Sequence, residues 1–310
     1  MIRSVQWTIT GLVACLLAGP SFAASVILNE YNAVKDTGYL ERGGTDSYFG
    51  RVLGNGGDWF ELVVVEDVDM RDWSFVWAND DTEENTGTIF LSNDPFWQDM
   101  KAGTIITIIQ SPAPSGMDTD ETINHTTDWW VNICTEEEQA HYNASERWLA
   151  RVYPSSDTGH FKADNDAWIL TIYDNRDNVV FGPAGEGIYV ENNKGISSSE
   201  VFYLYEDPGS SIMPNSIYDD GENSTFGAPN LSSKDPDEGE EPNIEENHVQ
   251  DFSAFWGDPL TCEQALQRGF SVEGDLDNDC RVGLGDLMVL LDHWLNCNDP
   301  QITGCDHPWE

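Results

Sequence analysis

The 310-residue sequence predicts a mainly β fold, a two-sheet β-sandwich, followed by a small α-helical module that carries a calcium-loop pattern. Three observations support this prediction. Short apolar segments separated by turn residues fill residues 25–232, an acidic run occupies 233–250, and helical periodicity with clustered cysteines follows over 251–310. We therefore expect two modules joined by a linker.

The first 24 residues have the pattern of a secretory signal peptide. Arg3 supplies a positive charge, and the apolar stretch GLVACLLAG follows it. Small residues then occur, so cleavage is expected after Ala23 or Ala24. The apolar stretch is shorter than the ~20 residues that span a bilayer, and no later stretch is long enough. We expect an exported protein without a transmembrane segment, secreted or held at the cell surface.

The charge excludes some classes of partner. The chain has 14 Lys and Arg against 56 Asp and Glu, a formal net charge of −42. A field of this sign repels phosphate backbones and anionic lipids, so nucleic acid and membrane surfaces are not expected as partners. It attracts cations, and it helps to keep an exported protein in solution.

Residues 25–232 alternate β-rich segments with Gly, Asn, Asp and Pro turns. Several segments are apolar on both faces, as in the central strands of a sandwich. A hairpin is expected over 173–180, because Asp and Asn tolerate the left-handed turn conformation. One short helix is expected within 135–152. The ten expected strand segments are 25–31, 58–66, 73–80, 87–94, 103–110, 129–135, 148–153, 166–174, 178–182 and 200–207.

The acidic segment SSKDPDEGEEPNIEENH, residues 232–248, has no aromatic residue and one aliphatic residue. Such a composition cannot bury a core, and its like charges repel one another. We therefore expect a solvated linker over 233–250.

The residues after the linker carry helical signals. TCEQALQRG, residues 261–269, begins with capping-box spacing and stops at a glycine. A second helix is expected over 284–296, where one face carries Leu284, Leu287, Leu291, Trp294 and Leu295. Helix, acidic loop and helix is the arrangement of an EF-hand-type site.

The loop between these helices, GDLDNDCRVGLGDL, has the spacing of a calcium loop. Calcium prefers six to eight oxygen ligands, and a twelve-residue loop supplies them from positions 1, 3, 5, 7 and 12. We therefore expect Ca²⁺ to bind here. The expected ligands are Asp275, Asp277, Asp279, the backbone carbonyl of Arg281, and Asp286.

Five cysteines remain beyond the expected signal peptide. In an oxidising compartment the four in the tail predict two disulfides, with three possible pairings. These four are Cys262, Cys280, Cys297 and Cys305. Cys280 takes the sixth loop position, where calcium loops carry glycine, and a disulfide from it could hold that turn. Cys134 stands alone and is expected to be a small buried hydrophobic residue.

The segment GDLDNDCRVGLGDLMVLLDHWL resembles one repeat of a type I dockerin, whose loops use aspartate at the twelfth position, as Asp286 does here. The resemblance implies a calcium-stabilised module that docks to another protein. Cellulosomal dockerins carry two such repeats and bind cohesin modules, whereas this chain has one recognisable repeat. A cohesin-like protein or a cell-surface component is therefore the expected partner.

The large region resembles the lamin-tail domain, an immunoglobulin-like β-sandwich found in secreted bacterial proteins and in nuclear lamins. Three pieces carry the resemblance: Asn29-Glu30, the run DWFEL at 58–62, and the run GAPN at 227–230. The order of the segments matches over most of 25–232, with extra residues in 35–57 and 111–165. The resemblance implies a binding or structural module.

Familiar catalytic patterns are missing from the sequence, which has no H-E-x-x-H, nucleophile elbow or phosphate loop. Glu30, Asp58 and Glu61 would converge if the first strands pair, and glycosidases use paired carboxylates. With 56 acidic residues such a pair arises by coincidence. We expect Glu30 and Glu61 to satisfy backbone groups or lie at the surface, and we assign no catalytic residue.

Tryptophans suggest a second class of function. Trp129 and Trp130, with Trp97 and Trp148, could stack on sugar rings, although core packing is the favoured interpretation. The first expectation is an exported, non-enzymatic binding or structural protein with an attachment module. The alternative is an accessory carbohydrate-binding component of an extracellular polysaccharide-degrading system.

Overall fold

The structure is a computed structural model, and it divides the chain into two compact units, Met1–Phe255 and Trp256–Glu310. Four predictions fall wholly or largely outside the described residues: the signal peptide at residues 1–23, the linker at residues 233–247, the helix at 261–269 and the four tail cysteines. The residues that it describes are 24–79, 86–111, 116–125, 127–140, 147–153, 160–188, 196–216, 218–232, 248–256, 276 and 283–293.

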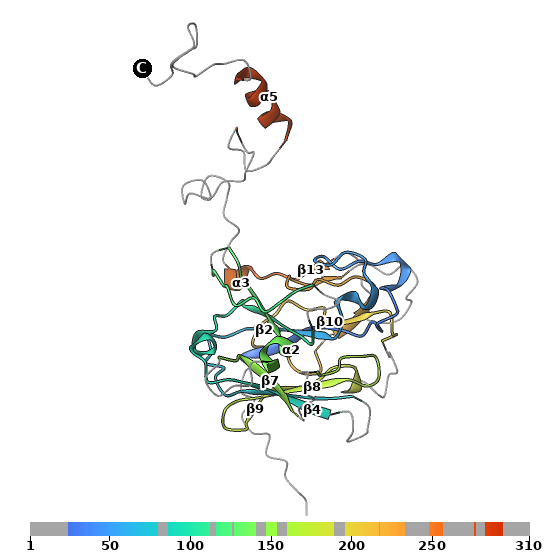
Figure 1. Ribbon diagram of the computed structural model, residues 1–310, viewed down its shortest axis with the longest axis vertical. Coiled ribbons are helices and arrows are strands. Elements are labelled where there is room, and N and C mark those ends of the chain that lie inside the picture. Colours follow the sequence, from blue (N-terminus) through green and yellow to red (C-terminus); the bar gives the residue numbers. More distant parts are fainter. Residues whose placement is uncertain are drawn as a thin grey trace, which may run out of the picture. The chain divides into compact units, whose positions relative to one another are not determined.

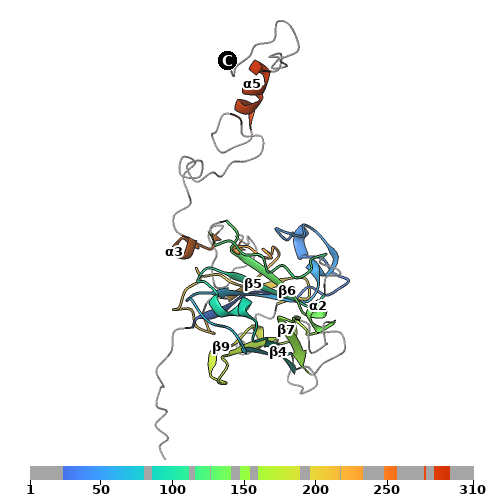
Figure 2. The same ribbon diagram turned by 60° about the vertical axis from the view of Figure 1, so that its left-hand side comes forward.

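The first unit is mainly β, and its two large sheets form separate layers in both views (Figure 1, Figure 2). The six-stranded sheet has the order β11-β10-β1-β2-β5-β6, and the five-stranded sheet has the order β7-β4-β3-β8-β9. Neighbouring strands are antiparallel except β5 and β6, which are parallel.

The strands of the six-stranded sheet are β1 (Val26–Asn32), β2 (Trp59–Val64), β5 (Ile105–Ile109), β6 (Trp130–Cys134), β10 (Val201–Leu204) and β11 (Tyr218–Gly221). Those of the five-stranded sheet are β3 (Ser74–Ala78), β4 (Thr86–Leu91), β7 (Ala150–Tyr153), β8 (Ile169–Tyr173) and β9 (Val179–Ala184). Each of the ten expected segments overlaps one of β1 to β10, so the prediction of a mainly β sandwich is confirmed. The strand β11 and the short pair β12 (Leu231–Ser232) and β13 (His248–Val249) were not expected.

Two local predictions inside the first unit are also confirmed. The hairpin at 173–180 joins β8 to β9, with Asp177 at a φ of 61° in the turn. The Asp174 carboxylate accepts hydrogen bonds from the backbone N–H groups of Arg176 and Asn178, which holds the turn closed. The short helix α2 (Thr135–Ala140) lies within 135–152.

Aromatic side chains fill the space between the two sheets. Tyr31 of β1 and Phe60 of β2 are direct neighbours on adjacent strands. The Tyr31 ring lies 4.4 Å from the Trp168 ring, and the Phe60 ring lies 6.1 Å from the Phe75 ring of β3. All four side chains are buried. Each such ring pair adds about 0.5–1.5 kcal/mol beyond its buried area, so this layer holds the sheets together.

The opposite face of the six-stranded sheet is covered by loops. Side chains alternate along a strand, so Trp59 and Glu61 point away from the layer that contains Phe60. Trp59 packs there against Cys134 and against Phe226, which arrives from the segment 222–230. Cys134 is buried, as expected, and burial raises the pKa of its thiol to about 11. This cover explains why all six residues of β2 are buried.

The chain returns to the first unit after the acidic segment. His248 pairs with Ser232 in the short ribbon of β12 and β13. Gln250 and Phe252 are buried, and the second unit begins at Trp256, five residues after the tail was expected to begin. Among the described residues no helix is long and apolar enough to cross a membrane.

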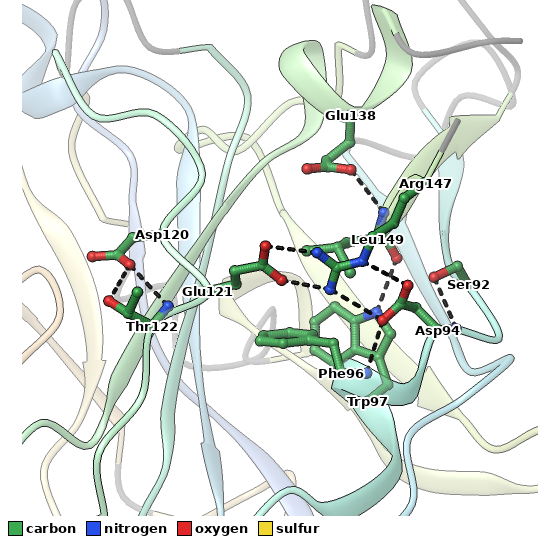
Figure 3. Close-up of polar contacts among 10 residues, drawn as sticks. All are labelled: Ser92, Asp94, Phe96, Trp97, Asp120, Glu121, Thr122, Glu138, Arg147 and Leu149. Atoms are coloured by element: carbon green, nitrogen blue, oxygen red, sulfur yellow. Dashed lines mark hydrogen bonds and ion pairs between the residues drawn. The ribbon is translucent and has the colours of Figure 1, made fainter. Parts of the chain in front are cut away.

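Arg147 fastens part of the extra segment 111–165 to the sandwich (Figure 3). Its guanidinium lies between two carboxylates, with Nε 2.7 Å from Asp94 Oδ2 and one terminal nitrogen 2.6 Å from Glu121 Oε1. Asp94 also accepts from the backbone N–H of Phe96 and so caps the turn Pro95–Asp99. The pair of carboxylates raises the pKa of Arg147. One side chain thus joins three separate stretches of the chain.

We expect Arg147→Ala to lower the free energy of unfolding by about 1 kcal/mol. Water screens this half-exposed ion pair and keeps the effect small, whereas bidentate contacts to two carboxylates make it larger than for an ordinary surface pair. Thermal melts in low and high salt measure the change, which salt should reduce. Arg71→Ala is the matched control, since Arg71 pairs, within the described part of the chain, with its near neighbour Asp69 and should change the melt little. Equal effects of the two substitutions would contradict the assigned role.

Candidate functional site

Two acidic side chains meet under the loop cover of the six-stranded sheet. Glu30 of β1 and Glu61 of β2 are register partners, next to a shift of register between Leu28 and Glu30. This irregularity leaves Asn29 as an extra residue of β1. Glu30 and Glu61 are 1% and 0% exposed. The structure therefore brings together two of the three carboxylates that were considered as a cluster.

Both carboxylate oxygens of Glu61 accept hydrogen bonds. Oε1 lies 2.7 Å from Asn29 Nδ2, and Oε2 lies 2.8 Å from the backbone nitrogen of Gly227. Gly227 has a φ of 75°, and a Cβ atom there would lie 2.4 Å from the Trp130 ring. Only glycine lets the backbone come this close to both Glu61 and Trp130.

Glu30 has a different set of partners. Its Oε2 accepts from the backbone nitrogen of Thr225 at 3.3 Å and lies 3.1 Å from the Thr225 hydroxyl. Its Oε1 is buried and has no hydrogen-bond partner among the described residues. Within the same part of the chain, neither Glu30 nor Glu61 forms an ion pair with a basic side chain. The two acids are thus buried without a countercharge.

Burial dominates the titration of this pair. It raises the pKa of Glu30 well above its usual range, and the neighbouring Glu61 and Asp46 raise it further. Burial also raises the pKa of Glu61 above its usual range. Two buried like charges side by side are not both ionised at neutral pH. Because both oxygens of Glu61 already accept N–H groups, we place the proton of the pair on Glu30 Oε1.

Asn29 connects this pair to the C-terminal part of the first unit. Its Nδ2 donates to Glu61 and to Asn230 Oδ1 at 3.0 Å, and its Oδ1 accepts from Gln250 Nε2 at 2.9 Å. Asn230 Nδ2 in turn donates to the Asn29 carbonyl at 3.1 Å. The three sequence pieces at 29–30, 58–62 and 227–230 therefore meet in one buried hydrogen-bond network.

Asp46 anchors the cover from its other side. Its Oδ1 accepts from the backbone nitrogens of Tyr48 and Phe49 at 2.7 and 2.8 Å. Its Oδ2 accepts from the Ser224 hydroxyl and, at 3.1 Å, from the Phe226 nitrogen. One carboxylate therefore closes its own turn and holds the covering segment in place.

Asp58 does not join the pair. Its carboxylate accepts from the backbone nitrogen of Ala163 at 3.4 Å, and burial raises its pKa to about 7. Glu30 and Glu61 bind backbone N–H groups, as expected, and the cover leaves no room for a substrate to touch them. A glycosidase needs both carboxyl groups at the bond that breaks. This pair therefore has the surroundings of a structural network.

The four singled-out tryptophans differ in their surroundings. Trp97 is fully buried, as the favoured interpretation predicts. Trp130 belongs to the aromatic cluster over the sheet, and the Trp129 ring lies 4.8 Å from the His125 ring. Trp148 lies beneath the Arg151 guanidinium at 4.1 Å.

Several residues of the network were not identified from the sequence. Asp46, Thr225 and Gln250 are polar residues in loops, where composition alone does not distinguish a buried partner from a solvated one. One sequence signal could have indicated that the chain packs on the sandwich again near Gln250. Apolar residues, Val249 and Phe252, return immediately after the acidic segment.

The second unit contains the helix α5 (Leu284–His293) and part of the expected calcium loop. The Asp286 side chain is buried, and its carboxylate accepts from the backbone nitrogens of Leu276 at 2.6 Å and Gly283 at 2.5 Å. Position 12 of the loop is therefore bonded to positions 2 and 9. The other four expected ligands, at 275, 277, 279 and 281, lie outside the described residues.

No protein-family model, no curated protein and no solved structure matches this chain. The roles assigned to these residues therefore rest on their contacts in the structure.

The buried acids should make the first unit more stable at lower pH. A carboxyl whose folded pKa is raised keeps its proton longer in the folded state, so stability is greatest below the unfolded pKa and falls as the pH rises through the folded value. With the pKa of Glu30 raised well above its usual range and that of Asp58 raised to about 7, the loss of stability falls between mildly acidic and mildly alkaline pH. We expect a higher melting temperature at about pH 5.5 than at about pH 8.5. A melting temperature that rises over this range would contradict the protonation assignment.

Substitution of each acid by glutamine, the neutral amide, distinguishes the role of Glu30 from that of Glu61. Glu30→Gln should be tolerated and should weaken the pH dependence, because it replaces the protonated member of the pair. Glu61→Gln should lower the free energy of unfolding by about 1–3 kcal/mol, because the new NH₂ group faces an N–H donor. Denaturant melts at several pH values measure both effects. Equal losses from the two variants would show that the proton does not reside on Glu30.

Proposed function

We propose that this chain is an exported, non-enzymatic binding or structural protein. Its first unit is a lamin-tail-like, immunoglobulin-like β-sandwich, and its tail is a calcium-stabilised, dockerin-like attachment module. The observation that carries the proposal for the first unit is the network around Glu61. It joins Asn29, Gly227 and Asn230, members of the pieces on which the resemblance depends, and it serves to hold loops on a sheet.

The proposal for the tail is supported by Asp286. A calcium loop must bring its twelfth residue back beside its beginning, because both supply oxygen ligands to one ion. Asp286 is bonded to the backbone of Leu276, the second loop residue, and stands in the first turn of α5. The proposed ligands are Asp275, Asp277, Asp279, the carbonyl of Arg281, and Asp286, and bridges among the four tail cysteines would hold the loop at Cys280. Such a small module gains most of its folding free energy from the metal.

We propose that the tail attaches the sandwich to a protein of the cell surface, of cohesin type or another, after export through the signal peptide. Four leucine and methionine side chains of α5 support a docking role, because they are exposed within the described residues of the tail. They are Leu284, Leu287, Met288 and Leu290.

Calcium binding is tested on the full chain by differential scanning calorimetry. In calcium at about 100 times its Kd, the transition of the tail should be stabilised by about 2.7 kcal/mol relative to chelator. Asp275→Asn with Asp279→Asn should remove that shift, and Glu66→Gln, an exposed acid of the first unit, is the matched control. A tail transition whose temperature is the same in calcium and in chelator would exclude the metal site.

Attachment is tested by sedimenting the full chain with cell envelopes of the source organism. Binding in calcium that is lost in chelator, and lost in the Asp275→Asn and Asp279→Asn variant, is the expected result. Binding that persists in that variant, and that soluble polysaccharide displaces, would favour the carbohydrate-binding alternative instead.

A further inference from the structure

We propose that His248–Phe252 is a docked strand that keeps the tail on the sandwich when the chain is cut within the acidic segment 233–247. This inference concerns an interaction surface of the first unit, and it does not depend on calcium. The surface is the socket formed around the Gln250 side chain, and its occupant is the chain's own segment His248–Phe252.

The socket matches a primary amide at both of its ends. Gln250 Oε1 accepts from the backbone nitrogen of Asn230 at 3.0 Å. Gln250 Nε2 lies 2.9 Å from Asn29 Oδ1 and from the Leu204 carbonyl, and 3.0 Å from the Glu206 carbonyl. The side chain is 4% exposed. An amide is the one group of this size that supplies an acceptor on one side and two hydrogens on the other.

The backbone on either side of Gln250 is held as well. The Gln250 nitrogen donates to the Asn230 carbonyl at 3.0 Å, and β13 pairs with β12. The Ser232 hydroxyl donates to the His248 carbonyl at 3.2 Å, and the Asp251 nitrogen donates to Asp207 Oδ1 at 2.8 Å. These contacts make a continuous line along five residues.

Phe252 adds apolar burial at the end of this line. Its side chain is 3% exposed, which removes most of an aromatic ring from water. Just before it in the chain, Asp251 accepts from the Ser253 nitrogen at 2.8 Å, at the start of the short helix α3 (Ser253–Trp256). The docked strand therefore ends at the boundary of the second unit.

The covalent connection plays no part in these contacts. Residues 233–247 leave the sandwich at Ser232 and return at His248, and these two residues are register partners. Every contact of Gln250 named above involves residues on the N-terminal side of a cut in 233–247. Cutting the segment removes the tether and leaves the docked surface intact. The two pieces then stay together as long as the socket holds Gln250.

The test uses the full chain with a recognition sequence for a site-specific protease placed within 233–247. After complete cleavage, size-exclusion chromatography under native conditions should show both pieces in one peak of one-to-one composition. Urea should separate them. A synthetic peptide of residues 248–256 in large excess should displace the tail piece, and the same peptide with Gln250→Glu should do so at least about tenfold less well.

Substitutions in the cut chain test the socket. Gln250→Glu keeps the size of the side chain but replaces both hydrogens with an acceptor facing Asn29 Oδ1 and two carbonyl groups, so the pieces should separate. Val249→Ala is the matched control, because Val249 is 58% exposed on the same strand, and its pieces should co-elute. Melts of the uncut variants confirm that each sandwich is folded.

Two results would overturn the inference. Separation of the cut wild-type pieces without denaturant would show that the covalent segment is what retains the tail. A peak at twice the mass, with mixed labelled and unlabelled pieces, would show that the socket takes the strand of a second copy instead.

Discussion

The first unit depends on one requirement, that the buried carboxylate of Glu61 must have hydrogen-bond donors on both of its oxygens. An unsatisfied buried charge costs several kcal/mol, so the position of Glu61 in the middle of β2 dictates what lies above it. One donor is a side chain of the adjacent strand, and the other is a backbone N–H at the far end of the unit. A strand near the start of the chain therefore needs a loop close to residue 230 to supply one of these donors. The loop that covers the sheet, the glycine at 227 and the position of Asn29 all follow from the need of Glu61 for these two donors.

The two faces of the six-stranded sheet illustrate two ways of holding a layer. Between the sheets, Tyr31 and Phe60 meet rings of the other sheet, and many small dispersion contacts add up without fixed directions. On the outer face, Glu30, Glu61 and Asn29 use a few directed bonds. Directed bonds specify one arrangement of the covering loop, whereas apolar contacts tolerate several. Irregular segments without strand pairing of their own can therefore lie in a fixed place.

Much of the first unit could be predicted from the sequence, because β-rich segments and turn residues are local signals. The paired Asp and Asn of the turn at 174–178 and the apolar segments of β1 to β10 are examples. The convergence of Glu30 and Glu61 on paired strands was considered, and bonding to backbone groups was one of the two expectations for them. The identity of those partners was not predictable, since Thr225 and Gly227 lie about 160 or more residues away, and nothing local marks them. Strand β11 was missed because YDDG has neither an apolar run nor alternation, and β13 because its two residues lie within the segment predicted as a solvated linker.

The adjacency of Ser232 and His248 has a consequence for how this chain can change over generations. The ends of the acidic segment are held at fixed, neighbouring points by contacts that do not involve the segment itself. The entropy of closing such a connection grows only with the logarithm of its length, about 0.6 kcal/mol for each doubling. Insertions, deletions and exchanges of one acidic residue for another therefore alter the fold very little. The length of this segment can therefore change over generations while the contacts at its two ends remain the same.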